Sequence, residues 1–363
     1  MTLHTTPLLA VHESLGASMV PFGGWLMPLR YGSDLAEHAA VRTAAGLFDL
    51  SHMAQIEISG SRAAEFLDGA LVGVPSRLRT GRAKYTMITD ADGRVLDDLI
   101  VYRLADTEYH VVANAANRER VVDALTARSR ATGTQVIDHT LSRAMVAVQG
   151  PRSAEILASV CDADLSELRY YAITPATVAG APALVARTGY TGEDGFEVIV
   201  GDAAGTPVWS ALLEAGAGSG LIPCGLASRD TLRLEAGMPL YGHELSEEIS
   251  PFEAGLGRVV DLDHDFVGRD ALARLAAEPP RRRLVGLVGE GRRAARAGAR
   301  VLRGGDDVGV VTSGVLSPTL GHPIALALLA TDAAEPGTGL EVDVRGRPLR
   351  MTVTTPPFHT RTH

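Results

Sequence analysis

The sequence predicts an α+β protein whose C-terminal part is a small β-barrel or sandwich. Strand-like and helix-like segments alternate along 363 residues without a fixed-period repeat, which argues against a solenoid or a propeller. A proline pair and a charge run at residues 278–283 end a helical segment and predict a domain boundary. Only short strand-like pieces, separated by glycine-rich turns, follow that boundary.

Two regions upstream of the boundary have strand patterns. Residues 95–102 are apolar apart from two adjacent carboxylates, which predicts a buried strand. Residues 183–187 and 196–200 predict two further strands, and the glycine-rich segment 188–195 predicts the loop between them.

The remaining elements lie on either side of the boundary. Residues 225–237 predict a helix that ends at a glycine shortly before a proline, and residues 270–277 predict a second helix. Four short strands are expected after the boundary, at residues 284–288, 308–313, 325–330 and 340–344.

The charge balance limits the chemistry. Thirty-four Lys and Arg residues face 43 Asp and Glu residues, for a net charge of −9, which argues against nucleic acid as a partner. Lys84 is the only lysine, and no Ser or Thr follows it as a phosphate-binding loop requires. Lysine-based covalent catalysis therefore has one poor candidate.

Cysteine usage and hydropathy point to the cytoplasm. Two cysteines, Cys161 and Cys224, cannot build a disulfide framework, and a reducing compartment is the natural interpretation. The first residues lack the pattern of a signal peptide, and no apolar run approaches the roughly 18 residues of a membrane span. The histidines show no compact ligand spacing, so no metal is expected.

Two patterns near residue 290 have weak functional interpretations. Residues 289–294 spell a dinucleotide fingerprint, but no clean crossover helix and ribose-binding acid follow it. Eight arginines gather at residues 281–303 without aromatic residues between them to stack bases. A solvated face is the first interpretation of this arginine cluster, and docking of an anionic partner or an anionic substrate tail is the alternative.

The carboxylates of the predicted strand 95–102 point to a site. Because side chains alternate along a strand, Asp97 shares a face with Leu99 and Asp98 shares the other with Tyr102. A dyad that shares one proton is therefore not expected. We expect one carboxylate to bond to a turn or an arginine and the other to face a cleft, where burial would raise its pKa.

Two further segments carry candidate ligand groups. Glu197 lies on a strand beside the glycine-rich loop, and its carboxylate suits a planar amidine-like edge such as a pterin or a guanine presents. Arg229 and Arg233 share one face of the predicted helix. They can pair with Asp230 or Glu235, or reach a ligand carboxylate.

Taken together, these segments resemble the glycine cleavage system T protein family, the aminomethyltransferases, over nearly the full length. Any one of the matching segments would be weak, whereas so many in the same order are specific. They comprise residues 22–29, 47–53, 93–102, 114–117, 149–151, 187–197, 229–238, 240–242, 251–257 and 312–321.

The resemblance implies an α+β fold with three subdomains arranged as a cloverleaf around a folate pocket and a C-terminal β-barrel. It places the folate-binding part in residues 1–275, as two interleaved α+β subdomains, and the barrel in residues 283–358. It also implies the reaction: the aminomethyl group on the lipoyl arm of the H protein yields ammonia and 5,10-methylenetetrahydrofolate. The implied partners are the lipoylated H protein and tetrahydrofolate as co-substrate, without nucleic acid or membrane.

The family's motifs also imply site residues. The catalytic aspartate falls on Asp98, where a fixed carboxylate would stabilise positive charge that develops as the one-carbon unit leaves sulfur. The pterin-binding glutamate falls on Glu197. The remaining folate-contacting positions fall on Tyr85, Asn114, Tyr190 and Arg229, and Arg361 is a weaker C-terminal candidate.

Two alternatives remain at this point. One is another tetrahydrofolate-dependent demethylase of the same superfamily. The other is a non-catalytic folate-binding protein that serves iron–sulfur assembly, although the presence of Asp98 argues against it.

Overall fold

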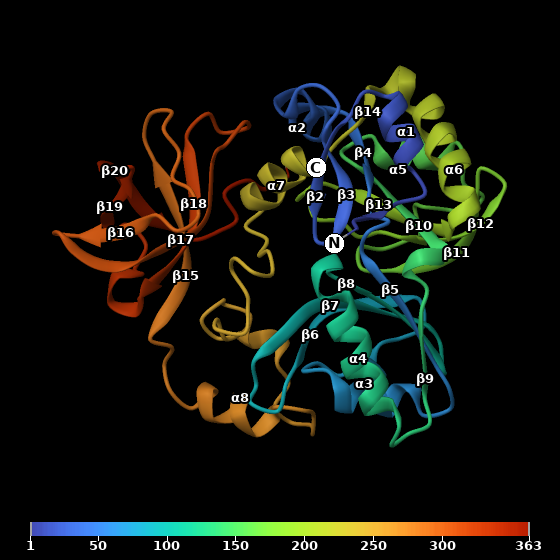
Figure 1. Ribbon diagram of the computed structural model, residues 1–363, viewed down its shortest axis with the longest axis horizontal. Helices are drawn as coiled ribbons and strands as arrows, with labels where there is room; N and C mark the ends of the chain where they lie inside the picture. Colours follow the sequence, from blue (N-terminus) through green and yellow to red (C-terminus); the bar gives the residue numbers. More distant parts are fainter. Residues whose placement is uncertain (1, 362–363) are drawn as a thin grey trace.

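A computed structural model describes residues 2–361 of the chain. Figure 1 shows two large sheets, one at the upper right and one at the bottom, and a separate barrel at the left. The strands are β1 (His4–Thr5), β2 (Ser18–Phe22), β3 (Trp25–Arg30), β4 (Ala45–Asp49), β5 (Ala54–Ser59), β6 (Arg82–Thr89), β7 (Val95–Ala105), β8 (Glu108–Ala113), β9 (Gln135–Asp138), β10 (Arg143–Gln149), β11 (Ile173–Val178), β12 (Ala181–Ala186), β13 (Gly195–Gly201), β14 (Leu221–Pro223), β15 (Arg282–Gly289), β16 (Arg300–Arg303), β17 (Asp306–Leu316), β18 (Pro323–Ala330), β19 (Gly339–Val344) and β20 (Arg347–Thr354). A small sheet has the order β1-β3-β2.

The helices flank these sheets. Within residues 2–361, no helix is long and apolar enough to cross a membrane. The helices are α1 (Leu9–Ser14), α2 (Asp34–Thr43), α3 (Ala63–Ala70), α4 (Arg118–Ser129), α5 (Ser153–Ala158), α6 (Asp202–Gly216), α7 (Leu226–Glu235) and α8 (Arg269–Ala276).

The N-terminal part is layered because each of its two large sheets is apolar on both faces. The six-stranded sheet has the order β11-β12-β13-β10-β4-β14, and α5 and α6 bury its outer face. The five-stranded sheet has the order β6-β7-β8-β5-β9, and α3 and α4 bury its outer face. The inner faces of the two sheets share one core, which includes Phe48, Tyr102, Met145 and Ile199. This shared core fixes how strands of the two sheets face each other.

The C-terminal strands close into a barrel with the order β15-β18-β17-β16-β19-β20. This settles the choice between barrel and sandwich and confirms the predicted α+β class. The barrel packs on α7 through Leu234, Ile324, Leu326 and Phe358. The pattern at residues 289–294 follows β15 as the turn toward β16, so the crossover helix that a dinucleotide site requires is replaced by a barrel connection.

Half of the eight-residue arginine cluster is engaged within the barrel. The guanidinium groups of Arg293 and Arg296 donate to backbone carbonyls, and Arg300 and Arg303 pair with Asp343 and Asp332. These contacts agree with the interpretation as a solvated face.

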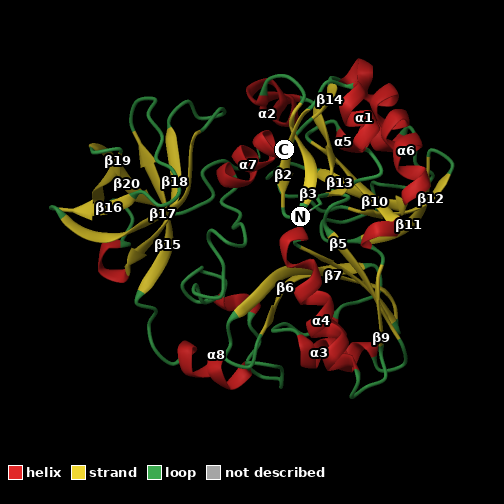
Figure 2. Ribbon diagram, viewed as in Figure 1, coloured by secondary structure: helices red, strands yellow, loops and turns green. Residues whose placement is uncertain are grey.

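The chain between α7 and α8 is almost entirely loop, as Figure 2 shows. It leaves α7 beside the barrel and crosses to the five-stranded sheet, where the Tyr241 hydroxyl donates to the carbonyl of Val95 at 2.8 Å. This crossing segment closes the central region from the side opposite the six-stranded sheet.

Candidate active site

A cavity of about 290 Å³ lies where the two inner sheet faces, α7 and the crossing segment meet. Strands β6, β7 and β13 contribute to its wall, together with the 188–195 loop. All six residues singled out by the sequence line this one cavity: Tyr85, Asp98, Asn114, Tyr190, Glu197 and Arg229. Residues separated by more than a hundred positions are thus brought together.

Asp98 is held at the cavity wall by two hydrogen bonds. The Tyr85 hydroxyl donates to Oδ2 at 2.8 Å, and the Asn114 side-chain amide donates to Oδ1 at 2.8 Å. Both donors stabilise the charged carboxylate, yet burial outweighs them and raises the pKa of Asp98. A carboxylate with a raised pKa that faces a cavity is suited to accept a proton or to stabilise a developing positive charge.

Asp97 points away from the cavity and is fully buried. Its carboxylate accepts the backbone N–H of Asn114 at 2.9 Å and the side-chain amides of Asn114 and Asn117 at 2.9 and 2.6 Å. The Asn114 amide therefore bridges both aspartates. Burial and the charge of Asp98 raise the pKa of Asp97 to about 7.

Glu197 lies on β13 and is 6% exposed. Its Oε2 accepts from the Thr188 hydroxyl at 2.5 Å and from the Tyr102 hydroxyl at 3.3 Å. No donor within residues 2–361 bonds to Oε1. Burial raises the pKa of Glu197, against the opposing effects of Thr188, Arg229 and Tyr102.

The two arginines of α7 have separate environments. Arg233 is 1% exposed, pairs with Glu244 and Asp230, and also donates to the Ser313 hydroxyl of the barrel at 2.8 Å. Arg229 lines the cavity with its guanidinium 4.9 Å from the ring centroid of Tyr190. Within residues 2–361, the Arg229 side chain makes no hydrogen bond or ion pair, so it is available to a ligand.

Several residues that line the cavity or contact Glu197 were not predicted from the sequence. Tyr171 and Tyr241 line the cavity, and Tyr171 adopts a backbone φ of +58°, which a non-glycine residue rarely does. Tyr102 bonds to Glu197, and its position on the same strand face as Asp98 was the signal that could have identified it. Thr188 is the first residue of the glycine-rich loop and has no comparable sequence signal.

The weaker C-terminal candidate, Arg361, lies outside the cavity wall, and so does His52. Arg361 is near Asp194, with 3.6 Å between Nη1 and Oδ1. His52 is buried, and its Nδ1 has no hydrogen-bond partner within the described chain. Within residues 2–361, no group of three or more His, Cys, Asp or Glu side chains is arranged to hold a metal ion.

A carboxylate-bearing cavity between two sheets, together with a separate C-terminal barrel, defines a two-part α+β enzyme. Residues 8–264 match the GCVT N-terminal domain, and residues 282–359 match the glycine cleavage T-protein C-terminal barrel domain. The chain belongs to the glycine cleavage T-protein family.

Similar proteins agree with this family. The aminomethyltransferase of Streptomyces coelicolor is 58% identical over 99% of this chain and 98% of that protein. The aminomethyltransferase of Saccharopolyspora erythraea is 56% identical over 98% of each chain. The crystal structure of glycine cleavage system aminomethyltransferase T from Bartonella henselae has a TM-score of 0.92 and 35% identity over 98% of both chains. The predicted family and the aminomethyltransferase class are confirmed.

Proposed function

We propose that this protein transfers the one-carbon unit from the aminomethyl-dihydrolipoyl arm of the H protein to tetrahydrofolate, releasing ammonia and forming 5,10-methylenetetrahydrofolate. The observation that carries this proposal is the shared cavity. It combines Asp98 with the incompletely bonded carboxylate of Glu197 and the unpaired guanidinium of Arg229.

The cavity residues fit a reduced folate. A pterin presents adjacent N–H donors, and Glu197 is a largely buried residue whose Oε1 atom has no protein donor among the described residues. The rings of Tyr85 and Tyr190 provide flat apolar surfaces for a bicyclic ring. Arg229 offers charge-assisted donors to an acceptor of the same ligand. We therefore assign Tyr85, Asn114, Tyr190, Glu197 and Arg229 to folate binding.

Tetrahydrofolate supplies the nucleophilic amine in this reaction, and the protein supplies its orientation and charge. Asp98 would face the positive charge that develops as the one-carbon unit leaves sulfur. Because Tyr85 and Asn114 occupy both carboxylate oxygens from the protein side, Asp98 is held in one orientation before substrate arrives. We assign Asp98 as the catalytic carboxylate.

The proposal includes a division of the chain. The folate-binding part comprises residues 1–275, and the barrel domain comprises residues 283–358. The segment that follows α8, with its proline pair, connects them, and α7 packs directly on β18 of the barrel.

The test is ammonia release. The purified protein is incubated with aminomethyl-loaded H protein and tetrahydrofolate, and ammonia is measured against reactions that lack the protein or the folate. We expect release that requires both the protein and tetrahydrofolate for its full rate. Ammonia no higher than in the protein-free reaction would contradict the proposed function.

A further inference from the structure

The segment Gln149-Gly150-Pro151 does not line the cavity and has no role in the proposed reaction. Gln149 is the last residue of β10, next to β13 in the six-stranded sheet. Its side chain is outside the cavity wall, and the residue is only 1% exposed. A buried amide has to satisfy its polar atoms within the protein, so its partners indicate what it does.

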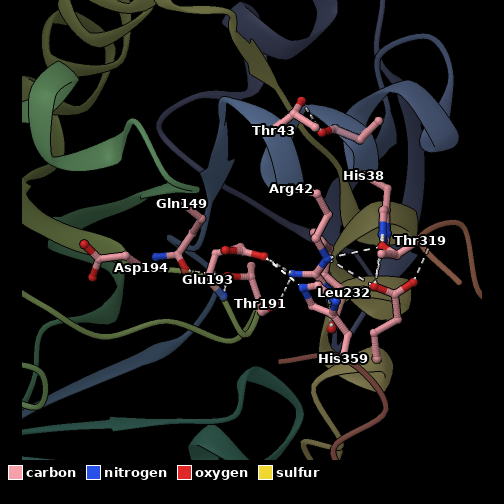
Figure 3. Close-up of polar contacts among 12 residues, drawn as sticks. His38, Arg42, Thr43, Gln149, Thr191, Glu193, Asp194, Leu232, Thr319 and His359 are labelled. Atoms are coloured by element: carbon pink, nitrogen blue, oxygen red, sulfur yellow. Dashed lines mark hydrogen bonds and ion pairs between the residues drawn. The ribbon is translucent and has the colours of Figure 1, made fainter. Parts of the chain in front are cut away.

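Both polar atoms of the Gln149 amide bond to the 188–195 loop. Nε2 donates to the carbonyl of Thr188 at 3.0 Å, and Oε1 accepts from the Thr191 hydroxyl at 2.9 Å. Figure 3 shows Gln149 beside Thr191 and Glu193 of this loop. One side chain therefore fixes two points of the loop, three residues apart.

The loop is also closely packed on Gln149. A Cβ at Gly189 would lie 2.0 Å from the Gln149 amide oxygen, and a Cβ at Gly195 would lie 2.3 Å from its amide nitrogen. Real Cβ atoms do not approach so closely. The glycines of this loop thus allow the backbone to close around the glutamine side chain.

A second anchor holds the far side of the loop. The Arg42 Nη1 atom of α2 donates to the Thr191 carbonyl and to the Glu193 carboxylate, each at 2.8 Å, as Figure 3 shows. With Thr191 fixed by both Arg42 and Gln149, the loop has little freedom at its centre. Its start, at Thr188, is held by Gln149.

Thr188 is the connection from this scaffold to the ligand cavity. Its carbonyl accepts from Gln149, and its hydroxyl donates to Oε2 of Glu197. The hydroxyl bond occupies Oε2 and leaves Oε1 for the ligand. A shift of the Thr188 backbone would change both the direction of this bond and the orientation of the carboxylate.

We propose that Gln149 is a positioning residue for folate recognition, which acts through Thr188 to orient the Glu197 carboxylate. This inference rests on the proposed function, because it assumes that Glu197 binds the pterin. Gln149 itself does not touch the ligand cavity. Its removal is expected to weaken tetrahydrofolate binding more than the chemical step.

Gln149→Met tests the proposal because methionine fills a similar volume without the two hydrogen bonds. We expect the dissociation constant for tetrahydrofolate, measured by calorimetry, to rise about tenfold, the scale of one lost buried hydrogen bond. The kcat for ammonia release is expected to change much less. Gln55→Met is the matched control, because Gln55 is also fully buried but its amide has no partner within the described chain. Its folate affinity should equal that of the wild type.

A double-mutant cycle separates positioning from general destabilisation. If Gln149 acts through Thr188, the variant Gln149→Met/Thr188→Val should bind folate no more weakly than Thr188→Val alone. Additive losses would overturn the proposed path. If Gln149→Met does not fold, Thr191→Val removes the bond to Oε1, together with a 3.3 Å bond from the Glu193 N–H, but keeps the bond between Nε2 and the Thr188 carbonyl. It should cause a smaller loss in the same direction.

The outcomes distinguish this inference from the proposed function. If the wild type binds tetrahydrofolate, Glu197→Ala does not, and Gln149→Met binds like the wild type, only the role of Gln149 is overturned. If the wild type does not bind tetrahydrofolate, the proposed function fails and the inference fails with it. Weakened binding by Gln149→Met, without further loss on adding Thr188→Val, supports the inference.

Discussion

The bonding of Asp98 determines what a conservative substitution does. Tyr85 and Asn114 both donate to its carboxylate, so Asp98→Asn keeps the shape but removes the charge. We expect this variant to fold and to bind tetrahydrofolate. Its rate of ammonia release should fall by about a hundredfold or more, the scale of one electrostatic or acid–base group. Single-turnover ammonia release is the measurement. A near-normal rate would remove Asp98 from the mechanism.

The titration of Glu197 is expected to make the affinity of the cavity for tetrahydrofolate depend on pH. Burial raises the pKa of Glu197, so it takes up a proton at a higher pH than an exposed glutamate, whose pKa is about 4.3. The charged form accepts ligand donors, so tetrahydrofolate affinity should fall as the pH is lowered and should level off above the pKa of Glu197.

Glu197→Gln is the control for this pH dependence. It removes the titration of residue 197 but leaves that of the folate itself. We expect weaker binding at neutral pH and a flatter affinity profile. A profile parallel to that of the wild type would contradict the role of the carboxylate.

Sequence patterns identified individual side chains with unusual chemistry but missed the residues that hold those side chains in place. Asp98 and Glu197 are carboxylates on otherwise apolar strands, which is an informative pattern. Gln149 and Thr188 are ordinary polar residues, and they become important only because β10 and β13 pair and the loop folds over them. Such partnerships depend on tertiary structure, so local composition does not reveal them.

At the element scale, the turn after β10 depends on Gly150. Its φ is +130°, and a Cβ there would lie 2.6 Å from the carbonyl oxygen of Ala44 and 2.7 Å from that of Val41. Gly150→Ala should lower the free energy of unfolding by about 2–4 kcal/mol, through backbone strain and overpacking together.

Gly60→Ala is the matched control for this turn. Gly60 has a similar φ of +136°, but its added Cβ would meet Thr134 at an ordinary 3.6 Å. Thermal unfolding of both variants should show the larger loss for Gly150→Ala. Equal losses would mean that crowding by the Ala44 and Val41 carbonyls contributes nothing.

The strands that were predicted and those that were missed differ in composition. β15 and β18 are continuous apolar segments and were expected. β16 has arginine at both ends, and β20 alternates buried with exposed residues, so neither forms an apolar run. Barrel closure supplies their partners, β17 and β19 for β16, and β15 and β19 for β20. The sequence therefore predicts a small barrel or sandwich in this part of the chain, but it does not predict the strands β16 and β20.

A buried carboxylate connects the C-terminal barrel to the N-terminal part of the molecule. Glu235 of α7 accepts from Arg42 of α2 and from Ser317 and Thr319 of the barrel, and it pairs with His38. Figure 3 shows Arg42, His38 and Thr319 converging at this point. The backbone carbonyl of Glu235 also accepts N–H groups from the chain after β20.

Glu235→Gln is therefore expected to destabilise the protein by about 3 kcal/mol at pH 7, because it removes one of the two carboxylates that pair with the buried Arg42 guanidinium and the charged acceptor of Ser317 and Thr319. Burial opposes the charge of Glu235, but His38, Ser317 and Arg42 outweigh it and hold the pKa of Glu235 well below its usual range. A lowered folded-state pKa contributes stability above the unfolded pKa of about 4.3, and this contribution is lost as the pH falls below it.

Denaturant unfolding of the wild type and Glu235→Gln checks this prediction. The difference in stability should be largest near neutral pH and should shrink as the pH is lowered, down to the lowest pH at which both proteins fold. A difference that stays constant over that range would show that the charge of Glu235 is not what connects the two parts.

The central claim is that the cavity holds tetrahydrofolate between Glu197 and Asp98. A crystal structure of Asp98→Asn with tetrahydrofolate tests this most directly, since the substitution should slow turnover while leaving the cavity intact. We predict electron density for the pterin in the cavity, with its amidine-like edge at Glu197 and its reactive nitrogen beside residue 98. Folate bound elsewhere, or a cavity without it at saturating concentration, would contradict the account.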